Sequence, residues 1–452
     1  MLGSDRTATI HALSSGAPPA GVGIIRVSGP LVPDLVRSWI GRSLIPRHAT
    51  LVTLTGADGE PLDDAMALHF PAPRSFTGED VLELHCHGGP AVIAAVTARL
   101  HHLGTRPAEP GEFTYRAHLN GRIDLIEAER LADVIDAETE AQRAFAVSDR
   151  GRVNAALYAS WRAQLIDMRA LMEAMIDFPD EDDAPIDVAP EVYGRVGDLI
   201  RGIEAHLAGA RSGEIVRAGY RLVLAGAPNA GKSSLLNALA GRDVAIVSPH
   251  AGTTRDVVEV VMDLQGYRVV VSDTAGLRRN PGDPVESLGI ERTVERTGSA
   301  DGTLWLIAPD NAADSPDDGD PLSLLEVEPV LTVATKADLD NGRIPTIADC
   351  RVSARTGEGM DALLNRLAAI VARQVPEPAQ SVPVAKRHVS HLERALVHLR
   401  MILPDPGDRL AVPAEIAAEH LRMAGDEIGR IGGEIGIEHV YDAVFSRFCM
   451  GK

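Results

Sequence analysis

Residues 226 to 233 have the types and spacing that bind the phosphates of a nucleotide. They read GAPNAGKS, which fits the pattern GxxxxGK[ST]. Gly226 and Gly231 let the backbone turn successive N–H groups toward a phosphate, and a helix that starts here adds the positive end of its dipole. Lys232 can reach the β- and γ-phosphates, and the Ser233 hydroxyl can bind magnesium. The segment predicts a nucleoside triphosphate site.

Two later segments supply further groups for the same site. Residues 273 to 276 read DTAG directly after a strand-like run, so Asp273 can hold magnesium through water and the Gly276 N–H can contact the γ-phosphate. Residues 251 to 256 read AGTTRD, where Thr253 or Thr254 can complete the magnesium shell in a switch loop. Together they predict hydrolysis of the bound nucleotide, not binding alone.

The base is read by residues 335 to 338, TKAD, with residues 352 to 354 as a base-facing loop after a last strand. The Asp338 carboxylate can accept two hydrogen bonds from guanine N1–H and N2–H, whereas adenine offers no such pair of donors. GTP is therefore the expected nucleotide. Each short motif alone is a weak match, but the five in order are specific.

The position of the Ras-type catalytic glutamine is taken by Leu277. Catalysis must therefore draw on another residue or on an ion. Asn229 lies inside the glycine loop, where position alone allows either an ion ligand or a residue that merely favours a turn.

The elements that must position these groups are readable from hydrophobic periodicity. Residues 222 to 225 form an apolar run typical of a buried parallel strand, and leucines and alanines at helical spacing follow the glycine loop. Residues 257 to 264 and 267 to 272 predict a hairpin joined at Gln265 and Gly266, and residues 330 to 334 predict another buried strand. We expect an α/β domain.

The rest of the chain predicts two other kinds of structure. The first 120 or so residues alternate short strands with about two helices, which favours an α+β domain. Long helices are predicted at 125–135, 153–176, 192–210, 391–402 and 414–423, so the nucleotide domain is inserted into a helical domain. The predicted boundaries are 1–121, 122–215, 216–376 and 377–452.

Composition limits where and on what the chain acts. There is no run of 18 apolar residues and no secretory signal pattern at the start, and three scattered cysteines suit a reduced compartment, so a cytoplasmic protein is expected. A net charge of −20 argues against a general nucleic-acid-binding surface, so any RNA contact must be local or shared with a partner. His85 and His87 fall on one face of a predicted strand, where a metal site is conceivable beside ordinary surface histidines.

The chain closely resembles the MnmE (TrmE) family of tRNA modification GTPases over essentially its whole length. The resemblance lies in VGIIRVSG, SFTGEDVLEL with HGGP, PGEFTYRAHLNGRIDL, IDFPDE, GAPNAGKSS, AGTTRD, DTAGLR, ESLGIER, TKAD and the final FCMGK. It implies a P-loop GTPase domain inserted into an α-helical domain and preceded by an α+β domain that binds tetrahydrofolate and dimerises.

The resemblance also implies site residues. The folate contacts map onto Arg26, Glu83, Arg122 and Lys452, with Arg122 in place of the family's lysine. Magnesium would be held by Ser233 and Thr254, and potassium by Asn229, Ser248, His250 and Thr253. Glu286 matches the family's water-orienting acid, and Cys449 its C-terminal modification cysteine. The expected nucleotide-binding residues are Asn229, Ala230, Gly231, Lys232, Ser233, Ser234, Ser248, Pro249, His250, Ala251, Gly252, Thr253, Thr254, Asp273, Thr274, Ala275, Gly276, Thr335, Lys336, Ala337, Asp338, Ser353 and Ala354. TKAD departs from the commoner NKxD at Thr335, which leaves Asp338 as the guanine reader.

The implied activity is potassium-dependent GTP hydrolysis coupled to tRNA modification. A homodimer would work with an FAD-dependent flavoprotein of the MnmG (GidA) type in a heterotetramer, with FAD and NADH on the partner and a one-carbon unit from methylenetetrahydrofolate. The product is an aminomethyl or carboxymethylaminomethyl group at carbon 5 of the wobble uridine. Two alternatives are a regulatory RNA- or ribosome-associated GTPase without modification chemistry and a dimeric scaffold with vestigial GTPase activity; folate binding would discriminate against the former.

Overall fold

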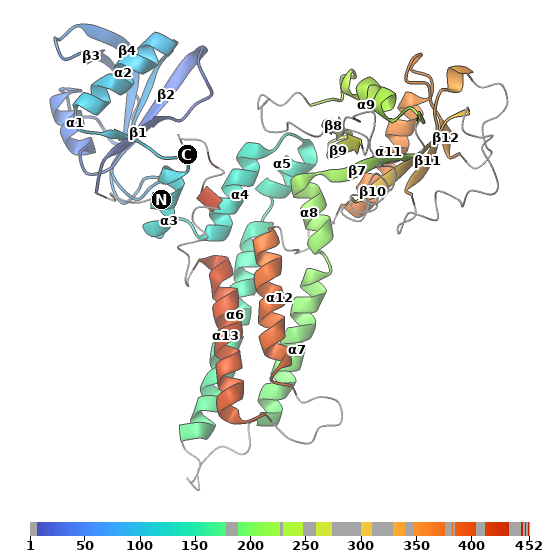
Figure 1. Ribbon diagram of the computed structural model, residues 1–452. Helices are drawn as coiled ribbons and strands as arrows, with labels where there is room; N and C mark the ends of the chain where they lie inside the picture. Colours follow the sequence, from blue (N-terminus) through green and yellow to red (C-terminus); the bar gives the residue numbers. More distant parts are fainter. Residues whose placement is uncertain are drawn as a thin grey trace, which may run out of the picture. The chain divides into compact units, whose positions relative to one another are not determined.

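A computed structural model describes most of the chain and divides it into two compact units (Figure 1). One comprises residues Met1–Ala132, Ala155–Pro179 and Ala414–Lys452, and the other Asp133–Asn154 and Asp180–Pro413. The described residues are all except 1–6, 178–188, 227–228, 247–258, 274–299, 310–328, 340–347, 376–381, 383–384, 404–411, 434–443, 446–447, 449–450 and 452. The four predicted domain ranges stay a prediction.

The first unit contains a six-stranded sheet in the order β3-β4-β5-β2-β1-β6. Its strands are β1 (Ile10–Leu13), β2 (Ala20–Ser28), β3 (Thr50–Thr55), β4 (Pro61–Phe70), β5 (Val81–Gly88) and β6 (Arg106–Pro107). Three helices accompany them, α1 (Val32–Ser38), α2 (Pro90–His102) and α3 (Glu112–Leu119). The expected α+β architecture is confirmed, with three helices where about two were predicted.

Alternation along β5 decides which face of this sheet is buried. Leu82, Leu84 and Cys86 are buried in the core, while Glu83 and the two histidines of the strand lie on the other face, because successive side chains of a strand point to opposite sides. On that face the His87 ring donates a 2.7 Å hydrogen bond from Nδ1 to Asp63 Oδ1. Across the described part of the chain, no group of three or more His, Cys, Asp or Glu residues could hold a metal ion.

Helices complete the first unit. These are most of α4 (Leu125–Asp136) and α6 (Arg150–Asp177), together with α13 (Ala414–Gly432). Residues near the end of the chain join the same unit, since Phe445 packs edge-on against Tyr115 at 5.4 Å between ring centroids. The Ser14 hydroxyl donates a 2.8 Å hydrogen bond to the Gly451 carbonyl. A core cluster therefore combines residues from distant parts of the sequence.

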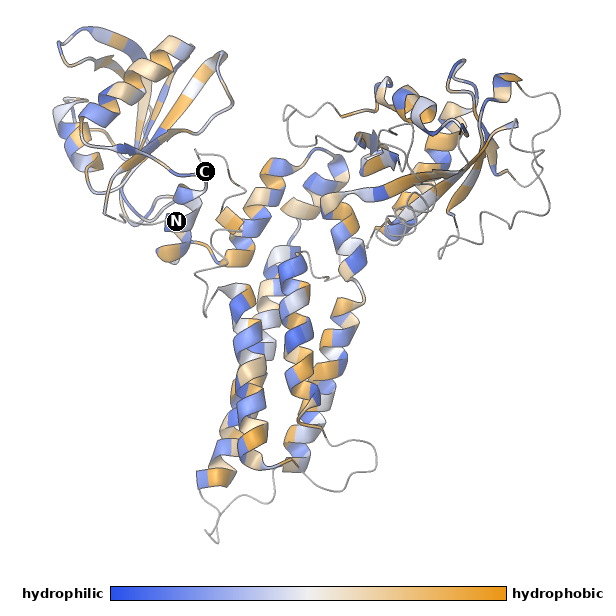
Figure 2. Cartoon of the chain, in the orientation of Figure 1, coloured by the Kyte–Doolittle hydropathy of each residue, from blue (hydrophilic) through white to orange (hydrophobic). Residues whose placement is uncertain are grey.

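The second unit is built on a sheet in the order β12-β11-β10-β7-β9-β8 (Figure 1). The strands are β7 (Tyr220–Gly226), β8 (Glu259–Leu264), β9 (Tyr267–Asp273), β10 (Gly302–Ile307), β11 (Leu331–Ala334) and β12 (Cys350–Arg351), parallel except for β8. Figure 2 shows hydrophobic residues along these strands, as expected where helices cover a sheet. The helices are α5 (Glu140–Val147), α7 (Ala189–Leu207), α8 (Ala210–Ala218), α9 (Lys232–Ala240), α11 (Met360–Gln374), α12 (Lys386–Arg400) and the 3-10 turn η3 (Ala337–Leu339).

The predicted hairpin is confirmed and its turn is explained by backbone geometry. Gln265 and Gly266 both have positive φ, 54° and 92°, as the two-residue turn between twisted strands requires. The predicted helix over 192–210 is wrong in one respect, because α7 ends at Leu207 and α8 begins at Ala210. At the break, a Cβ on Gly209 would lie 2.3 Å from the Val382 side chain, so the backbone at Gly209 approaches Val382 closely.

No helix in the described part of the chain is both long and apolar enough to span a membrane.

His11 makes the first unit sensitive to acid. Its Nδ1 lies 2.8 Å from the Thr105 hydroxyl, and burial, with a smaller effect of His101, lowers the pKa of His11 to about 4. The unfolded chain therefore binds a proton at a pH where the folded chain does not, so stability is complete above the ordinary pKa of 6.5 and declines as the pH falls toward 4. Lowering the pH from 7 to 5 is expected to lower the free energy of unfolding by about 2 kcal/mol through this residue.

The measurement is urea unfolding of this unit, followed by Trp39 fluorescence in a variant whose other two tryptophans are phenylalanine. His11→Gln cannot gain the proton, so its stability should change less between pH 7 and pH 5 than that of the parent. Equal changes in both proteins would contradict the prediction.

Candidate functional site

The glycine loop joins β7 to α9, in the strand-loop-helix context that the sequence predicts. Gly226 ends β7 with φ of 146°, and a Cβ there would lie 2.4 Å from the Leu306 carbonyl oxygen on β10. Gly231 precedes α9 with φ of 91°, and Asn229 also has a positive φ of 63°. These conformations favour glycine and asparagine, so the backbone geometry explains the spacing of the motif.

Three polar side chains meet between β7, α9 and the end of β9. Lys232 Nζ donates a 2.7 Å hydrogen bond to the Gly226 carbonyl, so the ammonium lies over the loop. Ser233 Oγ donates a 2.8 Å hydrogen bond to Asp273 Oδ2. A hydroxyl beside a carboxylate that is only 3% exposed is a pair of oxygen ligands of the kind that magnesium prefers. The residues present therefore fit a magnesium-bound phosphate group.

The predicted guanine side of the site is joined to the glycine loop by Thr335. Its hydroxyl donates a 2.6 Å hydrogen bond to the Ala230 carbonyl, and a Cβ on Gly231 would lie 3.4 Å from the same hydroxyl oxygen. The side chain is buried, at 4% exposed. The threonine that departs from the commoner asparagine thus retains a contact to the phosphate loop.

Asp338, the expected guanine reader, is oriented by the predicted base-facing loop. Ser353 Oγ, on a fully buried residue, donates a 2.6 Å hydrogen bond to Asp338 Oδ1. The two loops are also joined by the Ala337 N–H, which donates to the Val352 carbonyl at 3.1 Å. Lys336, in the first of these loops, has a positive φ of 54°.

Most described members of the predicted nucleotide site gather at one edge of the sheet. Gly226, Asp273, Thr335 and Ser353 each stand at or just beyond the carboxyl end of a parallel strand, where open α/β sheets bind ligands. Ser234 lies in the first turn of α9 and Ala354 follows Ser353. The predicted residues outside the described part of the chain are Ser248, Pro249, His250, Ala251, Gly252, Thr253, Thr254, Thr274, Ala275, Gly276, Glu286, Cys449 and Lys452.

A pocket with a volume of about 420 Å³ lies in the first unit. Glu83 and Arg122, both predicted folate contacts, line it. Arg26, a third, pairs with Glu83 through a 2.9 Å bond from Nε and lies 5.6 Å from the centre of the Phe76 ring. The residues that line the pocket are Arg47, Phe70, Arg74, Ser75, Phe76, Val81, Glu83 and Arg122. Three of the four predicted folate contacts are thus neighbours.

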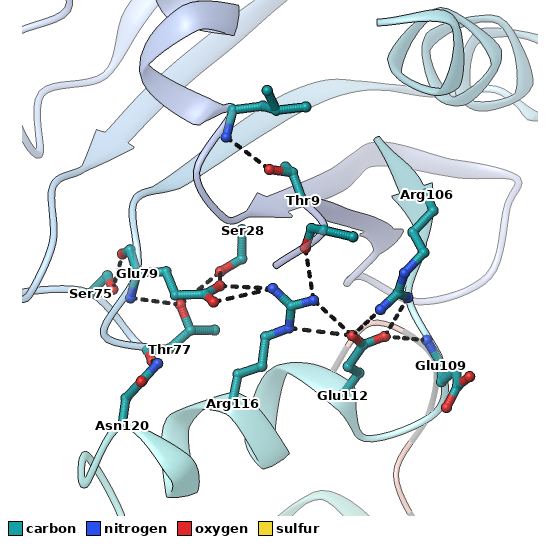
Figure 3. Close-up of polar contacts among 12 residues, drawn as sticks. Thr9, Ser28, Ser75, Thr77, Glu79, Arg106, Glu109, Glu112, Arg116 and Asn120 are labelled. Atoms are coloured by element: carbon teal, nitrogen blue, oxygen red, sulfur yellow. Dashed lines mark hydrogen bonds and ion pairs between the residues drawn. The ribbon is translucent and has the colours of Figure 1, made fainter. Parts of the chain in front are cut away.

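An ionic network with Glu112 and Arg116 buried at its centre reaches the chain segment that supplies Ser75 and Phe76 to this pocket, and sequence reasoning missed it (Figure 3). Arg116 Nη1 donates to both Glu79 carboxylate oxygens at 3.1 Å, and its Nη2 donates to Glu112 at 2.9 Å. Arg106 donates two more hydrogen bonds to Glu112. Burial alone would raise the pKa of Glu112, but these arginine bonds outweigh it and the pKa is lowered.

The network ties α3 to residues 75–79, which include the pocket residues Ser75 and Phe76. Asn120, at the end of α3, donates a 2.7 Å hydrogen bond to the Thr77 carbonyl. A Cβ on Gly78 would meet Arg122 Cγ at 3.3 Å. Gly78, in the segment that the network holds, thus lies close to Arg122.

Comparison with known proteins places the chain in a family. The model of the GTP-binding protein TrmE N-terminus matches residues 9–122, and that of the MnmE helical domain matches residues 125–449. The tRNA modification GTPase MnmE of Mesorhizobium japonicum is 45% identical, covering 98% of this chain and 99% of that protein. That of Rhizobium meliloti is 46% identical over the whole of both chains.

Among solved structures, one that resembles part of the chain is a GTPase domain. The G domain of the FeoB iron transporter of T. maritima is 26% identical and covers 34% of this chain and 98% of that chain, with a TM-score of 0.25. So low a score adds nothing to the sequence matches. The two family models and the full-length relatives show that the chain belongs to the MnmE (TrmE) family of tRNA modification GTPases.

Proposed function

We propose that this protein hydrolyses GTP in a potassium-dependent manner and uses the cycle to modify tRNA. With a flavoprotein of the MnmG (GidA) type, it adds an aminomethyl or carboxymethylaminomethyl group to carbon 5 of the wobble uridine of certain tRNAs. The observation that carries the proposal is the gathering of Lys232, the Ser233–Asp273 pair and the Asp338–Ser353 pair at one edge of the sheet. The family membership supplies the tRNA substrate class.

In the nucleotide site, each described side chain has a separate task. Lys232 would balance phosphate charge, Ser233 and Asp273 would hold magnesium, and Asp338 would select guanine. Thr254 completes the magnesium shell. Bound magnesium offsets the negative charge that develops on the phosphates during hydrolysis.

Asn229, Ser248, His250 and Thr253 would hold a potassium ion, which would supply the positive charge that an arginine finger supplies in other GTPases. Asn229 is the described member of the proposed ligand set, and its backbone is left-handed, with φ of 63°. Ser248, His250 and Thr253 supply the remaining oxygens. Glu286 orients the attacking water, in keeping with Leu277 at the position of the usual glutamine.

The pocket of the first unit fits a tetrahydrofolate. A carboxylate such as Glu83 can accept paired hydrogen bonds from the amino and N–H groups of a pterin edge, much as Asp338 does from guanine. Phe76 offers an aromatic wall and Arg122 a cation. The folate supplies a one-carbon unit, with Lys452 as a further contact and Cys449 acting in modification.

The remaining parts of the proposal concern the assembly. We expect a homodimer in the cytoplasm that forms a heterotetramer with the flavoprotein, which carries FAD and uses NADH. GTP-driven association and separation of the nucleotide domains would gate chemistry at the folate and tRNA sites.

Potassium dependence is the sharpest test. GTP turnover is measured in potassium chloride and in sodium chloride at equal ionic strength, with magnesium constant. A turnover at least about tenfold higher in potassium is expected, because one additional positive charge near the transferred phosphoryl group lowers the barrier by more than about 1.4 kcal/mol. Equal rates would remove the ion from the mechanism and favour a regulatory or scaffold role. Binding of tetrahydrofolate would then discriminate between these two roles.

A further inference from the structure

The pocket that contains Glu83 carries more positive charge than recognition of a pterin edge requires. Arg47, Arg74 and Arg122 line it, while the negative charge of Glu83 is already paired with Arg26. Within the described residues, the side chains of Arg74 and Arg122 form no ion pair with any carboxylate. The cavity therefore presents cations to whatever enters it.

We propose that Arg47 and Arg74 form a subsite for the carboxylates of the glutamyl tail, so that the protein prefers an oligoglutamyl folate to the monoglutamyl form. The inference rests on the proposed folate function and names the form of the ligand. Each glutamate added to the tail adds one carboxylate, and guanidinium groups bind carboxylates in a planar, paired geometry.

The two ends of the pocket lie at different positions along strands β4 and β5. Glu83 and Val81 share one face of β5, and Val81 pairs with Phe70 at the end of β4. Two residues along a strand advance about 7 Å, so the carboxylate of Glu83 and the ring of Phe70 are at different ends. Arg47 joins the Phe70 end, because its N–H donates a 2.8 Å hydrogen bond to the carbonyl of His69. A ligand whose pterin contacts Glu83 extends its tail toward the arginines.

The Arg47 guanidinium is held in place from two sides. It lies 5.4 Å from the centre of the Phe70 ring, and Nη2 donates to the carbonyl of Arg74. The backbone of Arg47 has φ of 61°, a left-handed conformation that non-glycine residues seldom adopt. Such a conformation costs about 1 kcal/mol or more and tends to persist at ligand-binding positions. Arg47 is thus pre-positioned with its remaining N–H groups available to a ligand.

Charge and size favour a small anion over RNA phosphates. The whole chain carries a net charge of −20, and these arginines surround a pocket of about 420 Å³ that has the Glu83 carboxylate within it. A volume of this size suits one small molecule, whereas a nucleic-acid backbone needs an extended positive surface.

The test compares two ligands on the full-length protein. Binding of 5-formyltetrahydrofolate as the monoglutamate and as the pentaglutamate is measured by calorimetry at low and at moderate salt. The wild type should bind the pentaglutamate about 5- to 20-fold more tightly at low salt, and less so at moderate salt, since exposed charge pairs are individually weak and screened.

Variants locate the preference. Arg47→Gln combined with Arg74→Gln should reduce it to about twofold or less, and Arg47→Lys combined with Arg74→Lys should restore part of it. Arg42→Gln is the matched control, because Arg42 is exposed in the same connection, bonds to the Leu51 carbonyl and does not line the pocket. Circular dichroism checks that each variant is folded.

Four outcomes are distinguished. A preference that is lost in the glutamine pair and kept in Arg42→Gln supports the proposal. A preference unchanged in the glutamine pair, or equal binding of both ligands by the wild type, overturns the tail subsite and leaves the folate function intact. Failure of the wild type to bind either ligand overturns the folate function itself. Reduced tRNA affinity in the glutamine pair with an unchanged ligand preference overturns the subsite and assigns the arginines to RNA.

Discussion

Asp338→Asn is expected to lower GTP affinity by about 100-fold or more while creating affinity for xanthosine triphosphate, because each hydrogen bond lost to a charged acceptor is worth about 1.5–3 kcal/mol. The Ser353 hydroxyl donates to Oδ1 at 2.6 Å. In the variant this bond holds the amide oxygen on the Ser353 side, so the NH₂ group faces the base. There it opposes the guanine donors but can donate to the carbonyl at carbon 2 of xanthine.

The affinities are measured by fluorescence titration with labelled GTP and labelled xanthosine triphosphate. Asp361→Asn removes the same charge from an exposed position in α11 and should leave both affinities unchanged. Tight GTP binding by Asp338→Asn would show that this carboxylate does not contact the base.

Arg116→Met is expected to have the largest effect on stability. Arg116 is only 4% exposed and bonds to Glu79, to the nearly fully buried Glu112 and, at 2.9 Å, to the Ala8 carbonyl. Removing one partner from a buried network leaves charges without compensation, which costs about 3–5 kcal/mol. Because the pKa of Glu112 is lowered in the fold, the network stabilises the unit above the ordinary glutamate pKa and this contribution is lost as the pH falls through the lowered value.

Hydrogen–deuterium exchange of peptides from β2, β5 and α3 measures the local opening free energy. Arg37→Met is the control, since the Arg37–Asp34 pair is exposed and should change the opening free energy by about 0.5 kcal/mol or less. Arg116→Lys keeps the charge without the planar fork and should fall between the two. Exchange in Arg116→Met as slow as in Arg37→Met would mean that the network adds no stability.

Features set by local chemistry could be predicted from the sequence. The glycine loop, the hairpin at Gln265 and Gly266, and the strands that lead into Asp273 and Thr335 each depend on residues within about ten positions of one another. The carboxyl-edge location of the nucleotide site then follows from the parallel sheet. The resemblance to a family added Arg26, Glu83 and Arg122, none of which periodicity alone could single out.

Features set by the packing of distant segments could not be predicted in the same way. The Arg116–Glu79 contact spans 37 positions and the Thr335–Ala230 contact spans 105. In the sequence, Glu79, Glu112 and Arg116 read as ordinary surface charges, because such residues are mostly exposed in proteins. One glutamate and two arginines, at 112, 106 and 116, were the available signal, but only the fold shows that Glu112 and Arg116 are buried.

The contacts of Phe445 and Gly451 also bear on how the protein is made. These residues complete a core with Tyr115 and contact the turn at Leu13 and Ser14, all of which belong to the first unit. Residues 133–443 must be synthesised after Ala132 and before Val444, which takes about 15 to 60 s at translation rates of 5–20 residues per second. During that interval the early part of this unit waits on the ribosome with an apolar surface uncovered. The risk of aggregation and the need for chaperones therefore grow with the time that the ribosome takes to synthesise the residues between these two segments of the core.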